Sequence, residues 1–237
     1  TSEGKIFYQH AGTVMKDISL AAQKAAELKN LSSGIIQIGL SPLTSLSVSS
    51  FLLAKFHNIY PTLRFRFLEA NTKELRHALE EDQIDLAFLP LLPQELDAEP
   101  SLECAGIHQE HLSVYLPHFH LLAHKQELRF KDLRQELLLL PPETCGYRQV
   151  IDYCFQQQNL MERPIFETTY PQMIASLIIS GSGIAILPSG AIQNEMVKEV
   201  PLADSPVILL TIARKQKRTI AHAAEKLYAF LQESYDG

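Results

Sequence analysis

Two cysteines lie nine residues apart in the second half of the chain, at Cys145 and Cys154. Cysteine thiols can take part in redox chemistry, because the thiolate is their reactive form. The residues between them have the pattern of a helix, on which nine residues correspond to opposite faces and about 13.5 Å of rise. Since a disulfide needs Cα atoms about 4.4–6.8 Å apart, its formation would require the start of that helix to unfold. The alternative is a pair of small buried residues, and we expect no bond between them in the untreated protein.

A second segment that could bind a ligand is SGSGIAILP, residues 180–188, because closely spaced glycines occur in phosphate-binding loops. A dinucleotide-binding loop follows a strand and precedes a helix, so that the phosphates meet the helix N-terminus. Here the order is reversed. QMIASLIIS has helical spacing, and GIAILP is typical of a buried strand that ends at Pro188. Gly181 suits the left-handed position after a helix. The sequence predicts a helix–glycine–strand connection and no nucleotide site.

Histidines are crowded in one region, at His108, His111, His118, His120 and His124. His118 and His120 would share a strand face, which would suit a metal, but the zinc-binding spacing of cysteine and histidine is missing. We expect strand and loop surface here, with no metal and no cofactor. The sequence contains neither Gly-x-Ser-x-Gly nor His-Glu-x-x-His, so we expect no enzymatic activity.

Composition limits the classes of function. The 237 residues are 46 % hydrophobic and 20 % charged, as in ordinary globular proteins, and the net charge is −6. An acidic chain lacks the electrostatic footprint of a nucleic-acid-binding surface. No apolar stretch is long enough to cross a membrane, and the first residues do not resemble a signal peptide. With three cysteines and no export signal, we expect a cytoplasmic protein.

The elements that would position these residues alternate between strand and helix from Gly34 onward. The first set is strand IIQIGL, helix TSLSVSSFLLAKFHNIY, strand LRFRFLEA, helix TKELRHALEED and strand IDLAFLP. Two extended pieces follow in LECAGIHQEHLSVYLP. The second set is strand ELLLLP, helix GYRQVIDYCFQQQNL, strand PIFET, helix PQMIASLIIS and strand GIAILP, before the final strand PVILLTIAR and helix IAHAAEKLYAFLQES. This order predicts an α/β protein with parallel strands covered by helices.

The first thirty residues have a different pattern. Apolar residues with alternating spacings of four and three form three heptads, at Phe7, Ala11, Val14, Ile18, Ala21, Ala25 and Leu28. This narrow seam predicts a long helix. It could lie on its own domain, but we favour pairing with a partner helix in at least a homodimer.

Ligands of open α/β folds bind where strands end at their carboxyl edge. Several of these positions begin helices, where free N–H groups favour anions, although Ser and Thr there could serve only as helix caps. Arg148 is the cation expected in this cleft, where it could bind an acid or form an ion pair with Asp152. The candidate ligand-binding residues are Ser41, Pro42, Leu43, Thr44, Asn71, Thr72, Leu89, Thr144, Cys145, Gly146, Arg148, Thr169 and Tyr170.

The order and spacing of several segments resemble the LysR-type transcriptional regulators across essentially the whole chain. TSEGKIFYQHA resembles the entry to their linker helix, and SSGIIQIGLSP resembles the first strand of their effector-binding domain. Three longer segments resemble further family signatures: FHNIYPTLRFRFLEANTKELRHALEEDQIDLAFLP, LLLLPPETCGYRQVID and IISGSGIAILPSGAI.

The resemblance implies a type 2 periplasmic-binding-protein fold, with two α/β lobes joined by two crossover strands and preceded by a long N-terminal linker helix. The implied parts are a linker and dimerisation helix at 1–33, lobe I at 34–108 with 207–237, and lobe II at 109–206. A small effector, by our expectation an organic acid, would bind between the lobes of a homodimer or homotetramer. DNA would be contacted only through an N-terminal winged helix-turn-helix that this chain lacks, and no membrane would be involved.

Within the resemblance, Thr44, Thr72 and residues 144–148 become the strongest ligand candidates. We expect Thr44, Thr72, Cys145, Gly146, Arg148, Thr169 and Tyr170 to line one pocket, and Arg148→Ala to weaken an acidic effector while leaving folding nearly intact.

Two alternatives stay open. The spacing of Cys145 and Cys154 equals that of the redox pair in the family's peroxide sensor, which indicates a thiol redox sensor. However, Thr144 stands where that sensor has a histidine, and Leu43 replaces a nearby threonine. The other alternative is a free-standing solute-binding protein of the same fold.

Overall fold

The first of two sheets joins the beginning and the end of the chain. This computed structural model describes residues 34–44, 46–96, 100–161, 164–216 and 220–234, together with ten of the first eighteen residues. The strands are β1 (Ile35–Leu40), β2 (Arg64–Glu69), β3 (Leu86–Leu91), β4 (Leu102–Glu110) and β10 (Ile208–Lys215), in the order β2-β1-β3-β10-β4. β1 is parallel to β2 and β3, whereas β10 is antiparallel to β3 and β4. The sheet is therefore mixed, which the expectation of parallel strands did not include.

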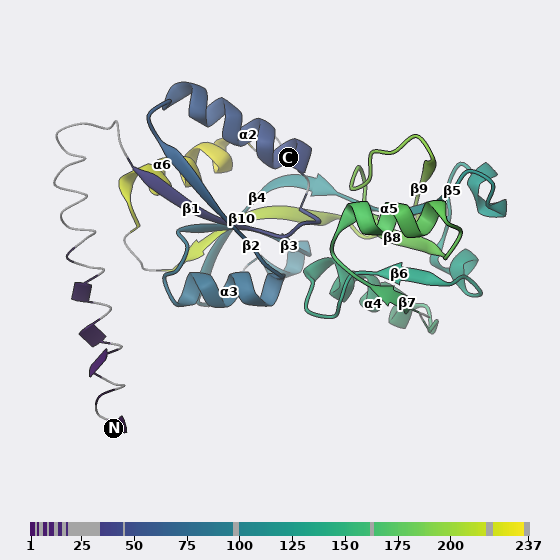
Figure 1. The fold of residues 1–237 in the computed structure, drawn as a ribbon, viewed down its shortest axis with the longest axis horizontal. Coiled ribbons are helices and arrows are strands. Elements are labelled where there is room, and N and C mark those ends of the chain that lie inside the picture. The colour runs from purple at the N-terminus through teal and green to yellow at the C-terminus, as the bar shows by residue number, and fades with distance from the viewer. Residues whose placement is uncertain are drawn as a thin grey trace.

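Helices cover both faces of this sheet, because its central strands are apolar on both sides. α2 (Leu46–Ile59) and α6 (His222–Glu233) pack together on one face, where Phe56 and Leu227 meet Ile38 in one core cluster. α3 (Thr72–Glu80) lies on the other face, where Leu75 and Leu79 join a separate cluster (Figure 1). The first sheet and these three helices are called the first lobe below.

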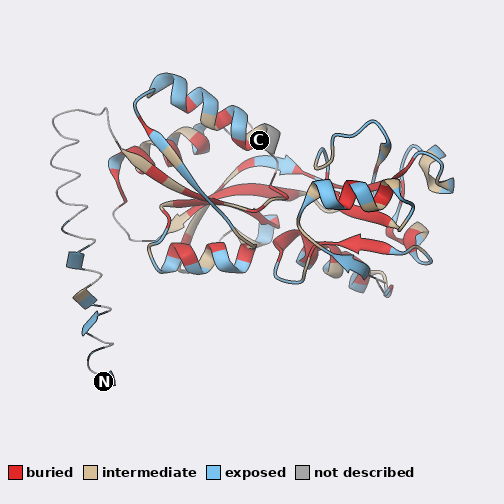
Figure 2. Ribbon diagram, in the orientation of Figure 1, coloured by how far each residue is buried: buried red, intermediate tan, exposed pale blue. Residues whose placement is uncertain are grey.

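The second lobe has a sheet of the same design. Its strands are β5 (Leu112–Pro117), β6 (Leu138–Leu140), β7 (Pro164–Glu167), β8 (Ile184–Pro188) and β9 (Val197–Pro201), in the order β7-β6-β8-β5-β9. α4 (Gly146–Gln157) and α5 (Pro171–Ile179) both contribute to one large core cluster with these strands. Three short 3-10 helices are η1 (Pro93–Glu95), η2 (Leu121–His124) and η3 (Phe130–Leu133). Buried residues are concentrated in the central strands of both sheets, whereas the edge strand β7 is exposed (Figure 2).

The chain passes between the lobes twice. β4 of the first sheet is followed directly by β5 of the second, with only His111 between them. The return runs from the end of β9 at Pro201 to the start of β10 at Ile208. Two α/β lobes joined by two crossing segments agree with the predicted fold, and the described part contains no helix that is long and apolar enough to cross a membrane.

The helix–glycine–strand prediction is confirmed. α5 ends at Ile179, and β8 begins at Ile184. Gly181 has φ +77°, a conformation that costs glycine little and other residues more. Two details were not predicted or were wrong: β9 was not foreseen, and His118 and His120 lie in a turn beyond the end of β5 instead of on one strand.

The N-terminal seam is described only in part. Ser2, Gly4, Phe7, Tyr8, His10, Ala11, Val14, Met15 and Ile18 are helical. The side chains of Phe7, Val14 and Ile18 are exposed. Ala21, Ala25 and Leu28 lie outside the described residues, so the continuous heptad helix and the dimer that it would build stay predictions.

Candidate functional site

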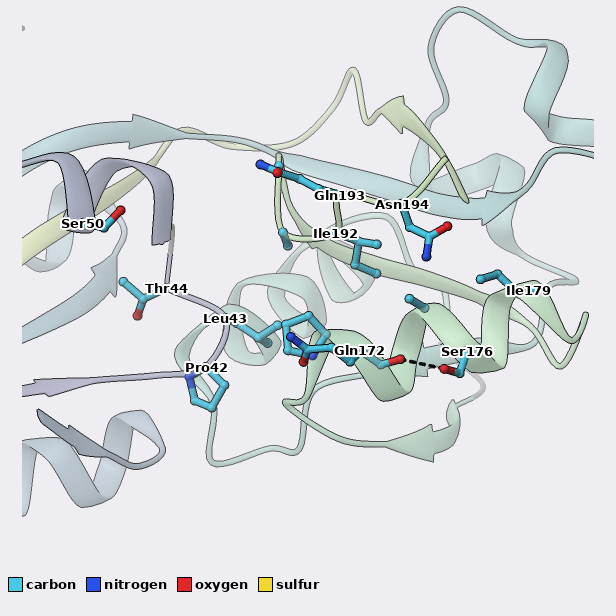
Figure 3. Close-up of a pocket in the computed structure, with 14 residues that line it drawn as sticks. Pro42, Leu43, Thr44, Ser50, Gln172, Ser176, Ile179, Ile192, Gln193 and Asn194 are labelled. Atoms are coloured by element: carbon cyan, nitrogen blue, oxygen red, sulfur yellow. Dashed lines mark hydrogen bonds between the residues drawn. The ribbon is translucent and has the colours of Figure 1, made fainter. Parts of the chain in front are cut away.

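A pocket lies where the first lobe faces α5 of the second (Figure 3). Its volume is about 630 Å³, within the range of sites for small molecules. The first lobe contributes Pro42, Leu43, Thr44 and Ser50. The second lobe contributes Pro171, Gln172, Ala175, Ser176 and Ile179 from α5, and Gly190, Ala191, Ile192, Gln193 and Asn194 from the loop after β8. Because residues from both lobes line it, a molecule bound there would contact both.

The lining combines apolar surface with neutral hydrogen-bonding groups. Of the described lining residues, none carries a charged side chain, whereas Gln172, Gln193 and Asn194 supply amides. In Figure 3 the Gln172 side chain points from α5 toward the turn that holds Leu43. The Ser176 hydroxyl donates to the Gln172 carbonyl at 2.9 Å, within α5. Recognition here would depend on hydrogen bonds and shape, because an ion pair with the described lining is not possible.

The turn after β1 forms the first lobe's wall of this pocket. The Ser41 N–H donates to Thr44 Oγ1 at 3.1 Å, and the Thr44 N–H donates to the Ser41 carbonyl at 2.9 Å. Leu43 is buried and belongs to the core cluster of the second lobe. The leucine therefore acts as an apolar contact between the lobes, at a position where the family resemblance suggested a hydroxyl.

The start of α5 forms part of the opposite wall. Tyr170 is the N-cap residue and is 62 % exposed, and Pro171 occupies the first turn, which suits a residue without an N–H. The Thr168 hydroxyl accepts from the Tyr170 N–H at 3.2 Å. Thr169 and Tyr170 were candidate ligand residues, but the described lining begins only at Pro171.

Four of the expected pocket residues are instead packed at or beside the contact between the lobes, a region called the junction and defined here as Thr72, Cys145, Gly146 and Arg148. Gly146 and Thr72 bind each other across the lobes, whereas the partners of Arg148 lie within the second lobe. The Gly146 N–H at the start of α4 donates to Thr72 Oγ1 at the start of α3, at 2.9 Å. A Cβ at Gly146 would lie 2.9 Å from the Pro90 ring and 3.1 Å from Thr72 Oγ1. The two helix starts can approach this closely because residue 146 is glycine.

Arg148 was expected to reach a ligand, but the structure gives its guanidinium other partners. Its Nε is 2.6 Å from Asp152, one Nη is 2.6 Å from Glu167, and the same Nη donates to the Pro141 carbonyl at 3.0 Å. Burial by itself lowers the pKa of Arg148, yet the hydrogen bonds and charges of the two carboxylates outweigh it and raise the pKa. Only 3 % of the residue is exposed. The ion pair with Asp152 that was the alternative is present, with the guanidinium buried and the Asp152 carboxylate partly exposed.

Cys145, the N-cap residue of α4, and Cys154 within α4 are both free and buried. Burial raises the pKa of the Cys145 thiol, although the nearby N–H groups of Tyr147 and Arg148 and the Ser41 hydroxyl oppose it. Burial also raises the pKa of Cys154 to about 11, with a contribution from the charge of Asp204. Both are therefore thiols near neutral pH, which is the less reactive form.

The remaining candidates also lie outside the described lining of the pocket. Asn71 caps α3, since its side chain accepts from the Glu74 N–H and the Glu74 carboxylate accepts from the Asn71 N–H. Leu89 is completely buried in β3. Thr144 is exposed just before the junction. Within the described part, no three side chains of the metal-binding types gather into one group.

Sequence reasoning missed most of the α5 face and the loop at 190–194. The rule that ligands bind beyond the carboxyl ends of strands pointed to the end of β8 and to the residues before α5. It did not indicate which residues of a helix face the opposite lobe. That depends on how α5 packs against β5, β8 and β9.

The two-lobed architecture is that of type 2 periplasmic-binding-like folds. The family model for the LysR substrate binding domain matches residues 29–236, and the chain belongs to this family.

Curated relatives and solved structures agree with this membership. The chain is 26 % identical over 222 residues to a hydrogen peroxide-inducible genes activator of Dickeya chrysanthemi, covering 93 % of this chain and 70 % of that protein. It is 27 % identical over 238 residues to the regulator CfxR of Cupriavidus necator, covering 98 % of this chain and 74 % of the relative. The effector-binding domain of QuiR in complex with shikimate superposes with a TM-score of 0.76 at 20 % identity, over 85 % of this chain and 97 % of that one. The full-length BenM E226K mutant superposes with a TM-score of 0.70 at 25 % identity, over 98 % of this chain and 77 % of that one.

Proposed function

We propose that this chain is the effector-sensing and oligomerising region of a bacterial LysR-type transcriptional regulator, and that a small metabolite binds in the interlobe pocket. The observation that carries the proposal is a cavity of about 630 Å³ with lining residues from both lobes. A ligand that contacts both lobes stabilises one relative arrangement over others, because its contacts differ between them. Two structural neighbours support a small effector, namely the effector-binding domain of QuiR in complex with shikimate and the regulatory domain of Synechocystis CcmR in complex with 2-PG.

We further propose that the effector is an organic acid. The support for this differs from the sequence-based argument, which relied on Arg148. Arg148 is engaged by two carboxylates, so it supplies no free cation. The positive end of the α5 helix dipole lies at Pro171 and Gln172 in the lining and favours a carboxylate, and neutral amides would hold the remaining polar groups. Binding would therefore depend only weakly on salt compared with an arginine-based site.

The rest of the function is proposed for the full-length protein. The lobes would comprise residues 34–108 with 207–237 and residues 109–206, and the segment 1–33 would build a cytoplasmic homodimer or homotetramer. The change in lobe arrangement would reach DNA through an N-terminal winged helix-turn-helix. Family membership favours this regulator over a free-standing solute-binding protein.

A thiol redox sensor is the second candidate. It is favoured by one observation, namely that several relatives at 25–26 % identity are named as hydrogen peroxide-inducible activators. The burial of Cys145 and Cys154 and their raised pKa values support the metabolite sensor instead.

A thermal-shift screen of small metabolites tests the proposal, with each acidic hit compared with its amide. We expect at least one acid to raise the melting temperature of this chain. Ser176→Phe would fill the pocket and abolish the shift. Met173→Phe is the matched control, because Met173 is an exposed residue of the same helix outside the lining. A hit that binds both variants equally would place the ligand elsewhere.

A further inference from the structure

A buried glutamate lies where the chain first leaves the first lobe. Glu110 is the last residue of β4, and it pairs in register with Ile208, the first residue of β10. The two segments that join the lobes therefore meet at this position. Only 5 % of Glu110 is exposed, which is unusual for a carboxylate that has no cationic partner among the described residues.

This glutamate is connected to the second lobe by one hydrogen bond. The Tyr147 hydroxyl on α4 donates to Oε2 of Glu110 at 2.6 Å, and Tyr147 is completely buried. The preceding residue, Gly146, donates its N–H to Thr72 of the first lobe. The first turn of α4 is thus held at two adjacent points, by the crossing strand and by the start of α3.

The second carboxyl oxygen of Glu110 is unsatisfied. Oε1 is buried and has no hydrogen-bond partner within the described part of the chain. An ionised carboxylate has two oxygens that each need donors, so a charged Glu110 is much more costly in this position than a neutral one.

We propose that Glu110 and Tyr147 form a proton-dependent latch between the crossing strand and α4. In the protonated state the carboxyl holds α4 against β4. Loss of the proton leaves a buried charge with one unsatisfied oxygen, and this loosens α4 together with the adjacent contact between Thr72 and Gly146. The latch regulates the lobe arrangement itself, so it does not depend on the identity of the effector.

The surroundings of Glu110 support this role. Burial raises the pKa of Glu110 to about 7, and the hydrogen bond from Tyr147 only partly opposes it. On α4, the other ionisable groups nearby are Cys145, a buried thiol, and Arg148, which pairs with Asp152 and Glu167. On β4 and the crossing segment, His108 and His111 are exposed to water, and the β10 partner Ile208 is apolar.

The direction of the effect follows from the raised pKa. The folded, latched form binds the proton more tightly than an opened form with an ordinary carboxyl pKa of 4.5. The contribution of the latch is complete below pH 4.5 and is lost as the pH rises to about 7, after which it changes little. Over the accessible window from about pH 6 to pH 8, the equilibrium for opening should rise about tenfold.

Hydrogen exchange of this 237-residue chain tests the latch. After correction for the intrinsic rates, we expect the protection of the amides of residues 146–148 to fall about tenfold between about pH 6 and pH 8. Glu110→Gln, which cannot ionise, should abolish this pH dependence. Glu103→Gln is the matched control, because it removes a half-exposed carboxylate from the same strand and should leave the pH dependence intact. Equal pH dependence in wild type and Glu110→Gln would overturn the proposal.

A second measurement does not require any variant to fold. A carbon-detected NMR titration of the wild-type glutamate carboxyl groups should show one group with a midpoint near pH 7. If every glutamate titrates near its ordinary value, Glu110 carries no raised pKa and the latch does not exist.

Discussion

The contact region between the lobes has two parts with opposite properties. In the junction, Thr72, Cys145, Gly146 and Arg148 are all buried, and their polar groups have partners within the chain. In the pocket, Gln172, Gln193 and Asn194 are exposed, and a cavity separates them from the first lobe. The difference suggests a division of roles. The junction would hold the lobes together, whereas the pocket would accept a ligand that changes how they are held.

The largest effect is expected from Arg148→Ala in the junction. The substitution removes a buried guanidinium and leaves Asp152, Glu167 and the Pro141 carbonyl without it. We expect the free energy of unfolding to fall by about 3 kcal/mol in urea denaturation. This reverses the expectation from the sequence that folding would stay nearly intact.

Arg214→Ala provides the control for Arg148→Ala. Arg214 also pairs with a carboxylate, that of Glu103, but both side chains are partly exposed. We expect a loss of no more than about 1 kcal/mol. Equal small losses in the two variants would show that the junction is not a region of higher stability.

A smaller loss is expected when the junction is overpacked. In Gly146→Ala, the added methyl would contact the Pro90 ring and Thr72 Oγ1 at less than ordinary van der Waals distances. We expect the free energy of unfolding to fall by about 2 kcal/mol. Ser176→Ala in the pocket, measured by the same urea denaturation, should change it by less than about 0.5 kcal/mol. The comparison fails if the order of these two values is reversed.

In the pocket, substitutions should affect binding more than folding. Gln172→Ala removes one neutral hydrogen-bonding group and should weaken effector binding by about 1 kcal/mol, roughly a fivefold rise in Kd. Calorimetry with an effector identified by the screen measures this change. Thr144→Ala, an exposed residue outside the lining, should leave Kd unchanged. An unchanged Kd in Gln172→Ala as well would remove the amide from the proposed site.

The smallest effect is expected when the protein is treated with mild peroxide, which should leave the thiols of Cys145 and Cys154 unlinked. Because the pKa of Cys154 is about 11, its thiolate fraction at pH 8 should be about a hundredfold below that of an unfolded cysteine. Alkylation in the native state should be slower than in urea by about that factor. Mass spectrometry should detect no bond between Cys145 and Cys154. A quantitative link between these two would instead favour the redox sensor.

Much of the fold could be predicted because the relevant signals are local. The order of strands and helices follows from hydrophobic spacing, and Gly181 marked the turn between α5 and β8. The strand β9 was missed because VKEVP alternates only weakly and is half exposed. The position of His118 and His120 was wrong because Pro117 ends β5 one residue earlier.

The site was predicted less well because it depends on contacts between distant segments. The rule for strand ends selected the turn at 41–44, of which Pro42, Leu43 and Thr44 line the pocket. The same rule selected Thr72 and Gly146, which are 74 residues apart and bind each other instead of facing a cavity. Their separation of 74 residues in the sequence does not indicate that they come within hydrogen-bonding distance of each other.

The sequence alone determined the order of strands and helices and the strand ends at which function could reside, because periodicity and turn residues act within a few positions. The resemblance to the LysR family added the two-lobed architecture. Only the tertiary structure decided which strand ends stay open and which are packed shut. Arg148 illustrates the reason. Asp152 is four residues away on the same helix, so that partner could be anticipated. The second partner of Arg148, Glu167, is nineteen residues away on strand β7, which lies beside α4 only once the second sheet has formed.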